Sequence, residues 1–280
     1  MKRISVNQNT NPTCYLISTP IGNLEDITFR AIKSMQLVDI LLAEDTRVSL
    51  KLLRHYQIDK QIVSYHDHNK EDMHLKIRQW FKEGKSIGLI SDAGMPLVND
   101  PGYELVLLAQ EMDVNVVSIP GPSASLSALV ISGFTPHPFL FYGFLPNKKQ
   151  KRIEELTRLQ VLPETLLFYE SPHRIQDTLY ECLKAFGDRR AFVARELTKL
   201  YEEGISGTLS EIAAIEEWKG EIVLVIEGFK GHTSVASECS IKQDVDRLIE
   251  SGQKKSDAMK QVAKERNLTK SVVYKEYHEE

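Results

Sequence analysis

The sequence predicts an α/β protein in which two α/β domains precede a small helical appendage. Strand-like apolar runs alternate with amphipathic helical patterns as far as residue 229. The alternation breaks once, at "FTPHPFLFYGFLPNKKQKR" (residues 134–152), where three prolines and a basic run interrupt the spacing. After residue 240 only helical periodicity remains. A length of 280 residues fits this division at about 150 residues per domain.

The first block, residues 1–122, is expected to form a largely parallel sheet. Helical patterns such as "DITFRAIKSM" and "KEDMHLKIRQWFKEG" lie between its apolar runs, which is the order of βαβ units with helices on the faces of the sheet. The expected strands are "CYLIS", "DILLA", "QIVSYH", "SIGLISD" and "NVVSIP".

The second block, residues 123–232, is expected to form a mixed sheet. The runs "AFVAREL" and "YEEGISGTL" are separated by only a turn, which favours antiparallel pairing. Thr208 and Glu211 have the spacing of a capping box at the start of a short helix. Residues 233–280 contain a polar linker and helical patterns around an "ERNLT" turn, an arrangement that resembles a helix-turn-helix.

Composition excludes several classes of protein. The chain is 42% hydrophobic and 26% charged, and no apolar run approaches the roughly 18 to 20 residues that cross a bilayer. The net charge of −4 argues against broad coating of nucleic acid but leaves room for a local basic patch. The polar N-terminus and three widely spaced cysteines indicate neither secretion nor a disulfide or zinc framework. We therefore expect a cytoplasmic protein without a membrane partner.

Three turns rich in small residues follow the first, fourth and fifth expected strands. They are "TPIGNLED", "DAGMPLVNDPG" and "PGPSAS", and parallel strands place them at one edge of the sheet. None is a phosphate-binding G-x-x-x-x-G-K-[ST] loop or a G-x-G-x-x-G fingerprint. Three such turns with a single acid after a strand suit a nucleoside-like ligand without a phosphate chain, such as S-adenosylmethionine. One turn alone would more often be purely structural.

A longer set of segments resembles the tetrapyrrole methylase superfamily, and within it the branch that 2′-O-methylates a cytidine of small-subunit (16S) ribosomal RNA. The similarity runs in order from about residue 15 to 229. Met95 and Pro172 depart from the residues common at these positions. The matching segments are "STPIGNLEDIT", "AEDTR", "HDHN", "SDAGMPLVNDPG", "PGPSA", "GFLPNKKQKR", "FYESPHR", "RELTKLYEE" and "KGEIVLVIEG".

The resemblance implies a homodimeric two-domain enzyme that holds S-adenosylmethionine between its α/β domains. Its partner would be the small ribosomal subunit or its rRNA, with no membrane, no metal and no DNA. The residues that would contact the methyl donor are Pro20, Ile21, Asp92, Ala93, Gly94, Met95, Ser123, Ala124, Phe168 and Tyr169. Asp92 is expected to bind the ribose or the amino acid end, and Gly94 to let the backbone approach the donor.

Acid, base and cationic side chains lie just past several expected strands. Candidates for the general base are Asp45, His66, His68 and Glu170, although each histidine could equally have a structural role. Guanidinium groups match phosphate, so Arg47 and Arg174 are expected to bind RNA, together with the basic run Lys148, Lys149, Lys151 and Arg152. An isolated basic run is otherwise a solvated helix start. In the second turn, Asp100 is predicted to cap the following helix.

Two alternatives stay open. The first is a methylase of the same superfamily that acts on a small tetrapyrrole or a protein residue. The second is a ligand-sensing regulator that binds DNA through its helix-turn-helix. Residues 241–280 hold nine Lys or Arg and eight Asp or Glu, a net charge of only +1, which is small for a DNA reader.

Overall fold

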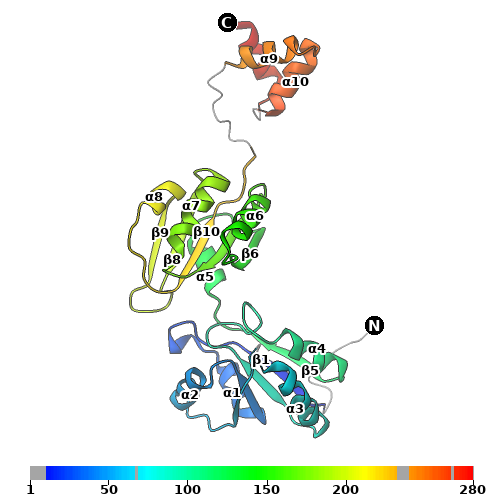
Figure 1. The fold of residues 1–280 in the computed structure, drawn as a ribbon, viewed down its shortest axis with the longest axis vertical. Coiled ribbons are helices and arrows are strands. Elements are labelled where there is room, and N and C mark those ends of the chain that lie inside the picture. The colour runs from blue at the N-terminus through cyan, green and yellow to red at the C-terminus, as the bar shows by residue number, and fades with distance from the viewer. Residues whose placement is uncertain (1–10, 67–68, 232–239, 266–267, 280) are drawn as a thin grey trace. The chain divides into compact units, whose positions relative to one another are not determined.

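The computed structural model describes residues 11–66, 69–231, 240–265 and 268–279. The chain divides into two compact units. Unit 1 contains both sheets and extends to Glu227, apart from the short stretch Val161–Pro163, which joins Gly228–Glu280 in unit 2. Figure 1 shows the order of the elements along the chain. The predicted α/β class with a parallel first sheet, a mixed second sheet and C-terminal helices is confirmed. The expected domain bounds stay a prediction.

The first sheet has the strand order β3-β2-β4-β1-β5, and all its pairs are parallel. Helices α1 and α2 bury side chains on one face, and α3 and α4 on the other, as alternating strand residues require. Its elements are β1 (Thr13–Ile17), η2 (Leu24–Asp26), α1 (Phe29–Leu37), β2 (Ile40–Ala43), α2 (Thr46–His55), β3 (Ile62–Ser64), α3 (Lys70–Lys82), β4 (Ile87–Ile90), α4 (Tyr103–Glu111) and β5 (Asn115–Ile119).

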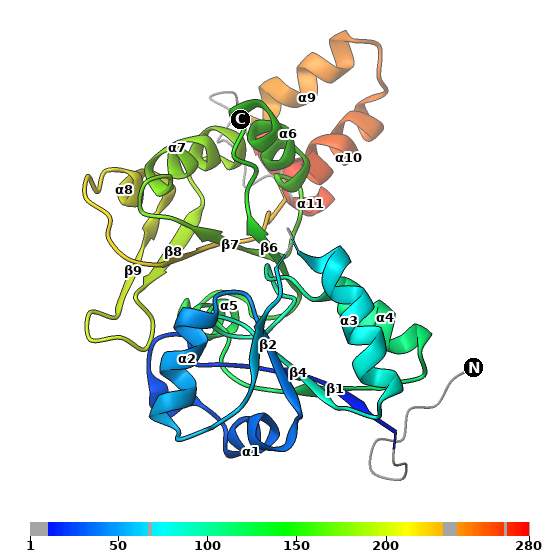
Figure 2. The same ribbon diagram turned by 60° about the horizontal axis from the view of Figure 1, so that its bottom comes forward.

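The second sheet has the order β6-β7-β10-β8-β9, in which only β6 and β7 pair in parallel. Helix α5 packs on one face of this sheet, while α6, α7 and α8 lie on the other face (Figure 2). The elements are α5 (Ala124–Ile131), β6 (Phe139–Phe144), α6 (Lys149–Leu159), β7 (Thr165–Glu170), α7 (Ile175–Phe186), β8 (Arg190–Arg195), β9 (Glu203–Thr208), α8 (Leu209–Ala213) and β10 (Ile222–Ile226). Thr208 and Glu211 form the predicted capping box of α8.

Unit 2 has a hydrophobic core of its own. Its helices α9 (Ile241–Glu250), α10 (Lys255–Glu265) and α11 (Lys270–Glu279) bury Val245, Met259, Val262 and Val273 against one another. Tyr277 donates a 2.6 Å hydrogen bond to Asp246 and carries the Lys255 ammonium over its ring. These contacts tie the three helices into one small bundle. No helix among the described residues is long and apolar enough to cross a bilayer.

Candidate active site at the carboxyl edge of the first sheet

The three small-residue turns meet at the carboxyl edge of the first sheet, as predicted. The backbones of Thr19 and Gly94 exchange two hydrogen bonds, of 2.9 Å and 3.1 Å, which join the first turn to the second. The third turn lies against the first, because a Cβ on Gly121 would come within 2.6 Å of the Ser18 Cβ. Ser18 also donates a 3.0 Å hydrogen bond to the carbonyl of Ile119. The turns therefore form one continuous wall.

The second turn holds an unusual backbone conformation. Gly94 has φ +81°, and a Cβ there would lie 3.3 Å from Ile21. Leu97 and Asn99 also have positive φ, of +70° and +68°, which is uncommon for residues other than glycine and is concentrated at functional sites. Both backbone polar groups of Gly94 bond to Thr19. The Gly94 backbone thus lies close to the first turn, while its approach to the donor stays a prediction.

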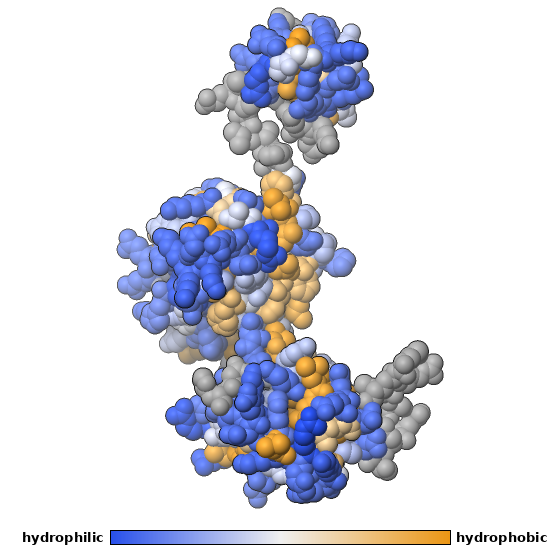
Figure 3. Space-filling view, turned by 45° about the vertical axis from the view of Figure 1, so that its right-hand side comes forward, coloured by the Kyte–Doolittle hydropathy of each residue, from blue (hydrophilic) through white to orange (hydrophobic). Residues whose placement is uncertain are grey.

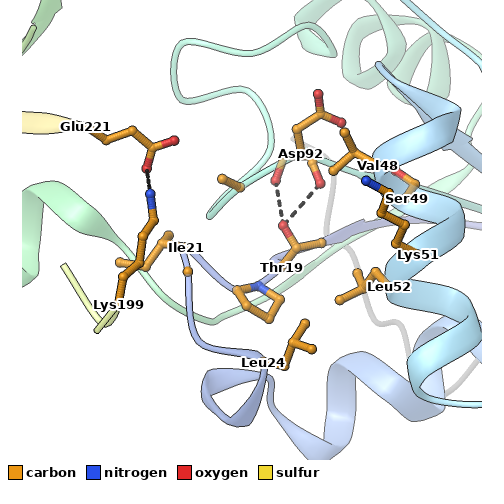
Figure 4. A pocket seen from close by; sticks show the side chains of 14 residues that line it. Thr19, Ile21, Leu24, Val48, Ser49, Lys51, Leu52, Asp92, Lys199 and Glu221 are labelled. Carbon is orange, nitrogen blue, oxygen red and sulfur yellow. Dashed lines mark hydrogen bonds and ion pairs between the residues drawn. The ribbon is translucent and has the colours of Figure 1, made fainter. Parts of the chain in front are cut away.

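A cavity of about 320 Å³ opens beside the joined turns. Four of the residues predicted to contact the methyl donor, Pro20, Ile21, Asp92 and Ala93, are part of its lining. Figure 4 shows Asp92 on one side of the cavity and Lys199 on the other. The remaining lining residues are Thr19, Gly22, Leu24, Val48, Ser49, Lys51, Leu52, Ser91, Lys199 and Glu221.

Besides Gly94, three further predicted donor contacts in the second and third turns lie outside this lining. Met95 is half-buried in the second turn. Ser123 is the N-cap of α5, where its hydroxyl accepts from the Leu126 N–H at 3.4 Å, and Ala124 packs against the core under α5. These positions shape the wall next to the cavity, and their contact with the donor stays a prediction.

Phe168 and Tyr169 do not flank a common ligand. Successive residues of a strand point to opposite faces, and these two are neighbours in β7. Phe168 is fully buried. The half-buried Tyr169 packs on the α5 side of the sheet, with its ring 4.9 Å from that of Phe141. The prediction that both side chains contact one donor is wrong for this geometry, because only Tyr169 lies on the face that α5 covers.

Asp92, in the cavity lining, is bonded to Asp45, the residue that caps α2. Asp92 accepts a 3.3 Å hydrogen bond from the backbone N–H of Asp45, and partial burial raises its pKa. Arg47 donates hydrogen bonds of 3.0 Å and 2.7 Å to the Asp45 side chain. These bonds lower the pKa of Asp45 to about 2, which makes it a weak base. Asp45 also caps α2 through the Arg47 N–H, at 2.8 Å.

Asp100 does not cap α4, contrary to the prediction. The N-cap is Gly102, with φ +138° and no side-chain hydrogen bond. Burial, with further contributions from Glu44 and Asp92, raises the pKa of the Asp100 carboxyl to about 6. Asp100 is therefore a third carboxyl group at this end of the sheet, with a pKa in the range of a histidine.

Glu170, at the end of β7, and Arg174, just before α7, are held by hydrogen bonds and by an ion pair with each other. The buried Glu170 carboxylate accepts from Thr178 at 2.7 Å and from the Ser171 N–H at 2.9 Å, and it pairs with Arg174 at 3.3 Å. Arg174 also donates to the Asn147 side chain at 2.6 Å. The Glu170 side chain is fully shielded from solvent, so it does not face the cavity as a candidate base would.

Arg152 is separated from the other cations of the basic run. It is 6% exposed and forms a two-point ion pair with Glu181 of α7, with one contact of 3.1 Å. Lys148, Lys149 and Lys151 are exposed. The prediction that Arg152 contacts RNA is corrected by this burial: a helix repeats every 3.6 residues, and Arg152 falls on the face of α6 that packs on α7.

His66 lies at the end of β3, the outer strand of the first sheet, and is not part of the cavity lining. Its backbone N–H donates to the Asn69 side chain at 2.9 Å. His68 lies outside the described residues. A catalytic role for either histidine stays a prediction.

Several residues of the cavity escaped the sequence analysis. Lys199 comes from the loop after β8, and its ammonium pairs with Glu196 at 2.9 Å and Glu221 at 3.1 Å. The loop is seated on the first turn, since Thr198 Oγ1 accepts from the Asn23 N–H at 3.0 Å. A Cβ on Gly22 would approach Lys199 Cγ to 2.6 Å. The segment "RELTKLYEE", which contains this loop, resembles the family, but no role was predicted for its residues.

Comparison with known proteins finds relatives over nearly the full length of the chain. A relative from Bacillus subtilis (strain 168) named ribosomal RNA small subunit methyltransferase I is 45% identical over 272 residues, covering 94% of this chain and 93% of its own. A relative of the same name from Streptococcus pyogenes serotype M1 is 40% identical over 278 residues, covering 98% and 97%.

Solved structures share the fold at low identity. The chain is similar to diphthine synthase, with a TM-score of 0.59, 14% identity and coverage of 77% of this chain and 90% of that one. It is also similar to the uroporphyrin-III-C-methyltransferase of Thermus thermophilus, with a TM-score of 0.53, 16% identity and coverage of 78% and 94%. The family described as Tetrapyrrole (Corrin/Porphyrin) Methylases matches residues 13–213. The chain belongs to this family.

Proposed function

We propose that this chain transfers a methyl group from S-adenosylmethionine to the 2′-hydroxyl of a cytidine in 16S rRNA of the small ribosomal subunit. The observation that carries the proposal is the near full-length likeness to relatives named ribosomal RNA small subunit methyltransferase I. S-adenosylmethionine is the methyl donor of this family. The proposed compartment is the cytoplasm, where ribosomal subunits would be met.

The carboxyl edge of the first sheet fits such a donor. When bound, the donor supplies a methyl group on a positively charged sulfur. Asp92 offers an exposed carboxylate to a cationic or hydroxyl-bearing ligand, and Pro20, Ile21 and Ala93 offer small or apolar surface beside it. Holding the acceptor oxygen in line with the methyl group would supply most of the rate. Asp45 and His66 stay candidates for the proton acceptor, whereas the enclosed Glu170 does not.

The start of α6 fits RNA phosphates. Lys148, Lys149 and Lys151 are exposed there, the first turn has no acidic residue, and no side chain caps the helix. The N-terminus of a helix carries partial positive charge, so lysines there repel it when no ligand is bound. A bound anion is attracted both by the lysines and by the free backbone N–H groups. We assign RNA contact to these lysines and to Arg47, whose side chain is 87% exposed. Arg152 instead positions this segment through its ion pair with Glu181, while Arg174, whose side chain is 27% exposed, stays a proposed RNA contact.

A homodimer is also proposed. Six of the eight residues of helix α5 are apolar, so a single packed face leaves apolar surface uncovered. Leu126, Val130 and Ile131 are 48%, 72% and 50% exposed. Figure 3 shows apolar surface over the part of unit 1 where β6 lies, and Phe144 of β6 is 52% exposed. A second copy of the chain would cover this surface and the edge of the sheet.

The test uses small subunits from a strain that lacks this protein. Purified protein and labelled S-adenosylmethionine should label their rRNA. Because a 2′-O-methyl group removes the nucleophile of alkaline RNA cleavage, the modified position should resist alkali, and mass spectrometry should place it on a cytidine. Label on a base, on a ribosomal protein or on a tetrapyrrole would overturn the proposal, and the last two would favour the alternative substrates of the family.

The lysines of α6 are tested in the same assay. Replacing both Lys148 and Lys149 by Ala should raise KM for the subunit and reduce the salt slope of binding by about 1 to 2, while donor affinity stays unchanged. Lys184→Ala, at an exposed position in the last turn of α7, is the control for the loss of a surface lysine away from the start of α6. Equal effects of the two changes would contradict an RNA role for the start of α6.

A further inference from the structure

One side of α11 gathers exposed cationic and aromatic residues. Residues four apart lie on the same side of a helix, so each side of α11 can be followed as a row. The row Val273 and Tyr277 packs in the core of unit 2. The neighbouring row is Lys270, Tyr274 and His278, and all three residues are exposed. This exposed row holds no acidic residue.

The net charge of +1 over residues 241–280 hides an uneven distribution. Glu276 shares its row with Val272, on the opposite flank of the packed row of α11. In α10, Asp257 pairs with Lys260 at 3.5 Å, so these two charges offset each other. The exposed row of α11 therefore carries positive charge, although the appendage as a whole is nearly neutral.

A second cation is joined to this row through a cluster of rings. The centre of the His278 ring lies 4.5 Å from that of Tyr274 and 5.2 Å from that of Tyr277. The Lys255 ammonium lies 4.3 Å from the centre of the Tyr277 ring. Neither Lys255 nor Lys270 forms an ion pair within the described part of the chain. We name Lys255, Lys270, Tyr274 and His278 the α11 patch.

The groups of the α11 patch suit unpaired nucleotides. Exposed aromatic rings stack on bases, and ammonium groups neutralise phosphates, in proteins that bind single strands. Tyr274 is 57% exposed, so a base can reach its ring. The two lysines supply the charge that a phosphate beside such a base requires. The α11 patch therefore matches single-stranded RNA in both shape and charge.

The same helix is poorly equipped to read a duplex. In a DNA-binding helix-turn-helix, the second helix enters the major groove and contacts base edges. Arg, Asn and Gln, which bind base edges at two points, are absent from α11, "KSVVYKEYHE". A duplex of RNA would not admit the helix, because its major groove is deep and narrow. Stacking on unpaired bases is the mode that remains.

We propose that unit 2 binds an unpaired stretch of small-subunit rRNA through the α11 patch, with a base stacked on Tyr274 and phosphates held by Lys255 and Lys270. Such a contact adds affinity for the substrate, whereas the proposed methyl transfer takes place in unit 1. The proposal rests on the proposed rRNA methylation. Because the contact is the same before and during the reaction, changes in the patch should act on KM for the subunit and leave kcat unchanged.

The first variant removes the ring. Tyr274→Ala should raise KM for small subunits by at least about five-fold, with kcat and the dissociation constant for S-adenosylmethionine within about two-fold of the wild type. Tyr274→Phe keeps the ring and should keep the wild-type KM. Tyr180→Ala removes a tyrosine that is 48% exposed on α7 of unit 1, and it is the control. An unchanged KM in Tyr274→Ala, or an equal loss in Tyr274→Phe, would overturn the proposal.

The second variant removes the charges. Lys255→Ala combined with Lys270→Ala should reduce the salt slope of subunit binding, measured by filter binding, by about 1 to 1.5. Lys242→Ala combined with Lys260→Ala removes the same number of charges from α9 and α10 and should leave the slope unchanged. Equal slopes in the two double variants would contradict the assigned phosphate contacts.

Two further outcomes separate the alternatives. Binding of duplex DNA that is as tight as binding of subunits, and that is lost in Tyr274→Ala, would overturn the choice of RNA in favour of a DNA reader. Wild-type protein that binds subunits through the α11 patch but transfers no methyl group would instead refute the proposed function and leave the RNA contact standing. The two failures are therefore distinct.

Discussion

Asp100 shows how a single carboxyl group can make stability depend on pH. Its pKa is raised from 3.8 to about 6, so between these values the folded protein binds a proton that the unfolded chain has already released. The stabilisation from this proton is fully present below pH 4 and is lost as the pH rises through 6. Above that pH the buried charge opposes folding beside Glu44 and Asp92.

Asp100→Asn should therefore stabilise the protein only at high pH. At pH 8 we expect the free energy of unfolding to rise by on the order of 1 kcal/mol, after allowance for the screening of a partly exposed site. At pH 4 the variant and the wild type should agree. Urea denaturation at the two pH values measures this. Asp59→Asn, in an exposed loop, is the control, and a gain of the same size at both pH values would contradict the assignment.

Individual side chains also mark the limit of the sequence analysis. The burial of Arg152 depends on Glu181, which lies in another helix, and the role of Lys199 depends on contact with Gly22, far away in the chain. Neither contact leaves a local pattern in the sequence. The error over Phe168 and Tyr169 is different, because strand alternation alone forbids both rings on one face.

Helix α5 has more apolar residues than its one packed face can bury. Ala128 and Leu129 lie in the core against the second sheet, while Val130 on the same helix is 72% exposed. The proposed second copy of the chain would bury that exposed surface. The same argument does not apply to α3, whose exposed Leu75 is a single apolar residue on a polar helix face.

Val130→Asp should convert the proposed dimer into a monomer. Burying an unpaired carboxylate in an apolar interface is costly, so light scattering should show the mass fall from twice 31.9 kDa to 31.9 kDa. Leu75→Asp introduces the same charge at a position of equal exposure, 73%, and should leave the mass unchanged. A wild-type protein that is already monomeric at working concentration would refute the proposed dimer.

The sequence could predict elements and their order because periodicity is local. The all-parallel first sheet, the mixed second sheet and the capping box of α8 all follow from patterns within a few residues of one another. The meeting of the three turns followed from the parallel direction of their strands. The part of the cavity that α2 lines could not be predicted in this way, because it depends on how α2 packs beside the first turn.

The whole molecule consists of two units, each with its own core. Core substitutions should therefore act on one unit at a time. Leu224→Ala in unit 1 and Met259→Ala in unit 2 remove similar buried volumes from positions that are 0% and 3% exposed. Each should lower the stability of its own unit by about 2 to 5 kcal/mol. Scanning calorimetry should show two transitions, of which each variant shifts one; a joint shift would show that the units unfold together.

The main-chain bridge between Thr19 and Gly94 holds the first two turns together independently of the side chains that line the cavity. The joint between the turns is made by main-chain groups, so it does not depend on the side chains of α2 that face the cavity. Val48 and Leu52 can then be exchanged without disturbing the joined turns, where the methyl donor is proposed to bind. The cavity is for this reason a suitable starting point for engineering, because one of its walls can be substituted while the joined turns stay in place.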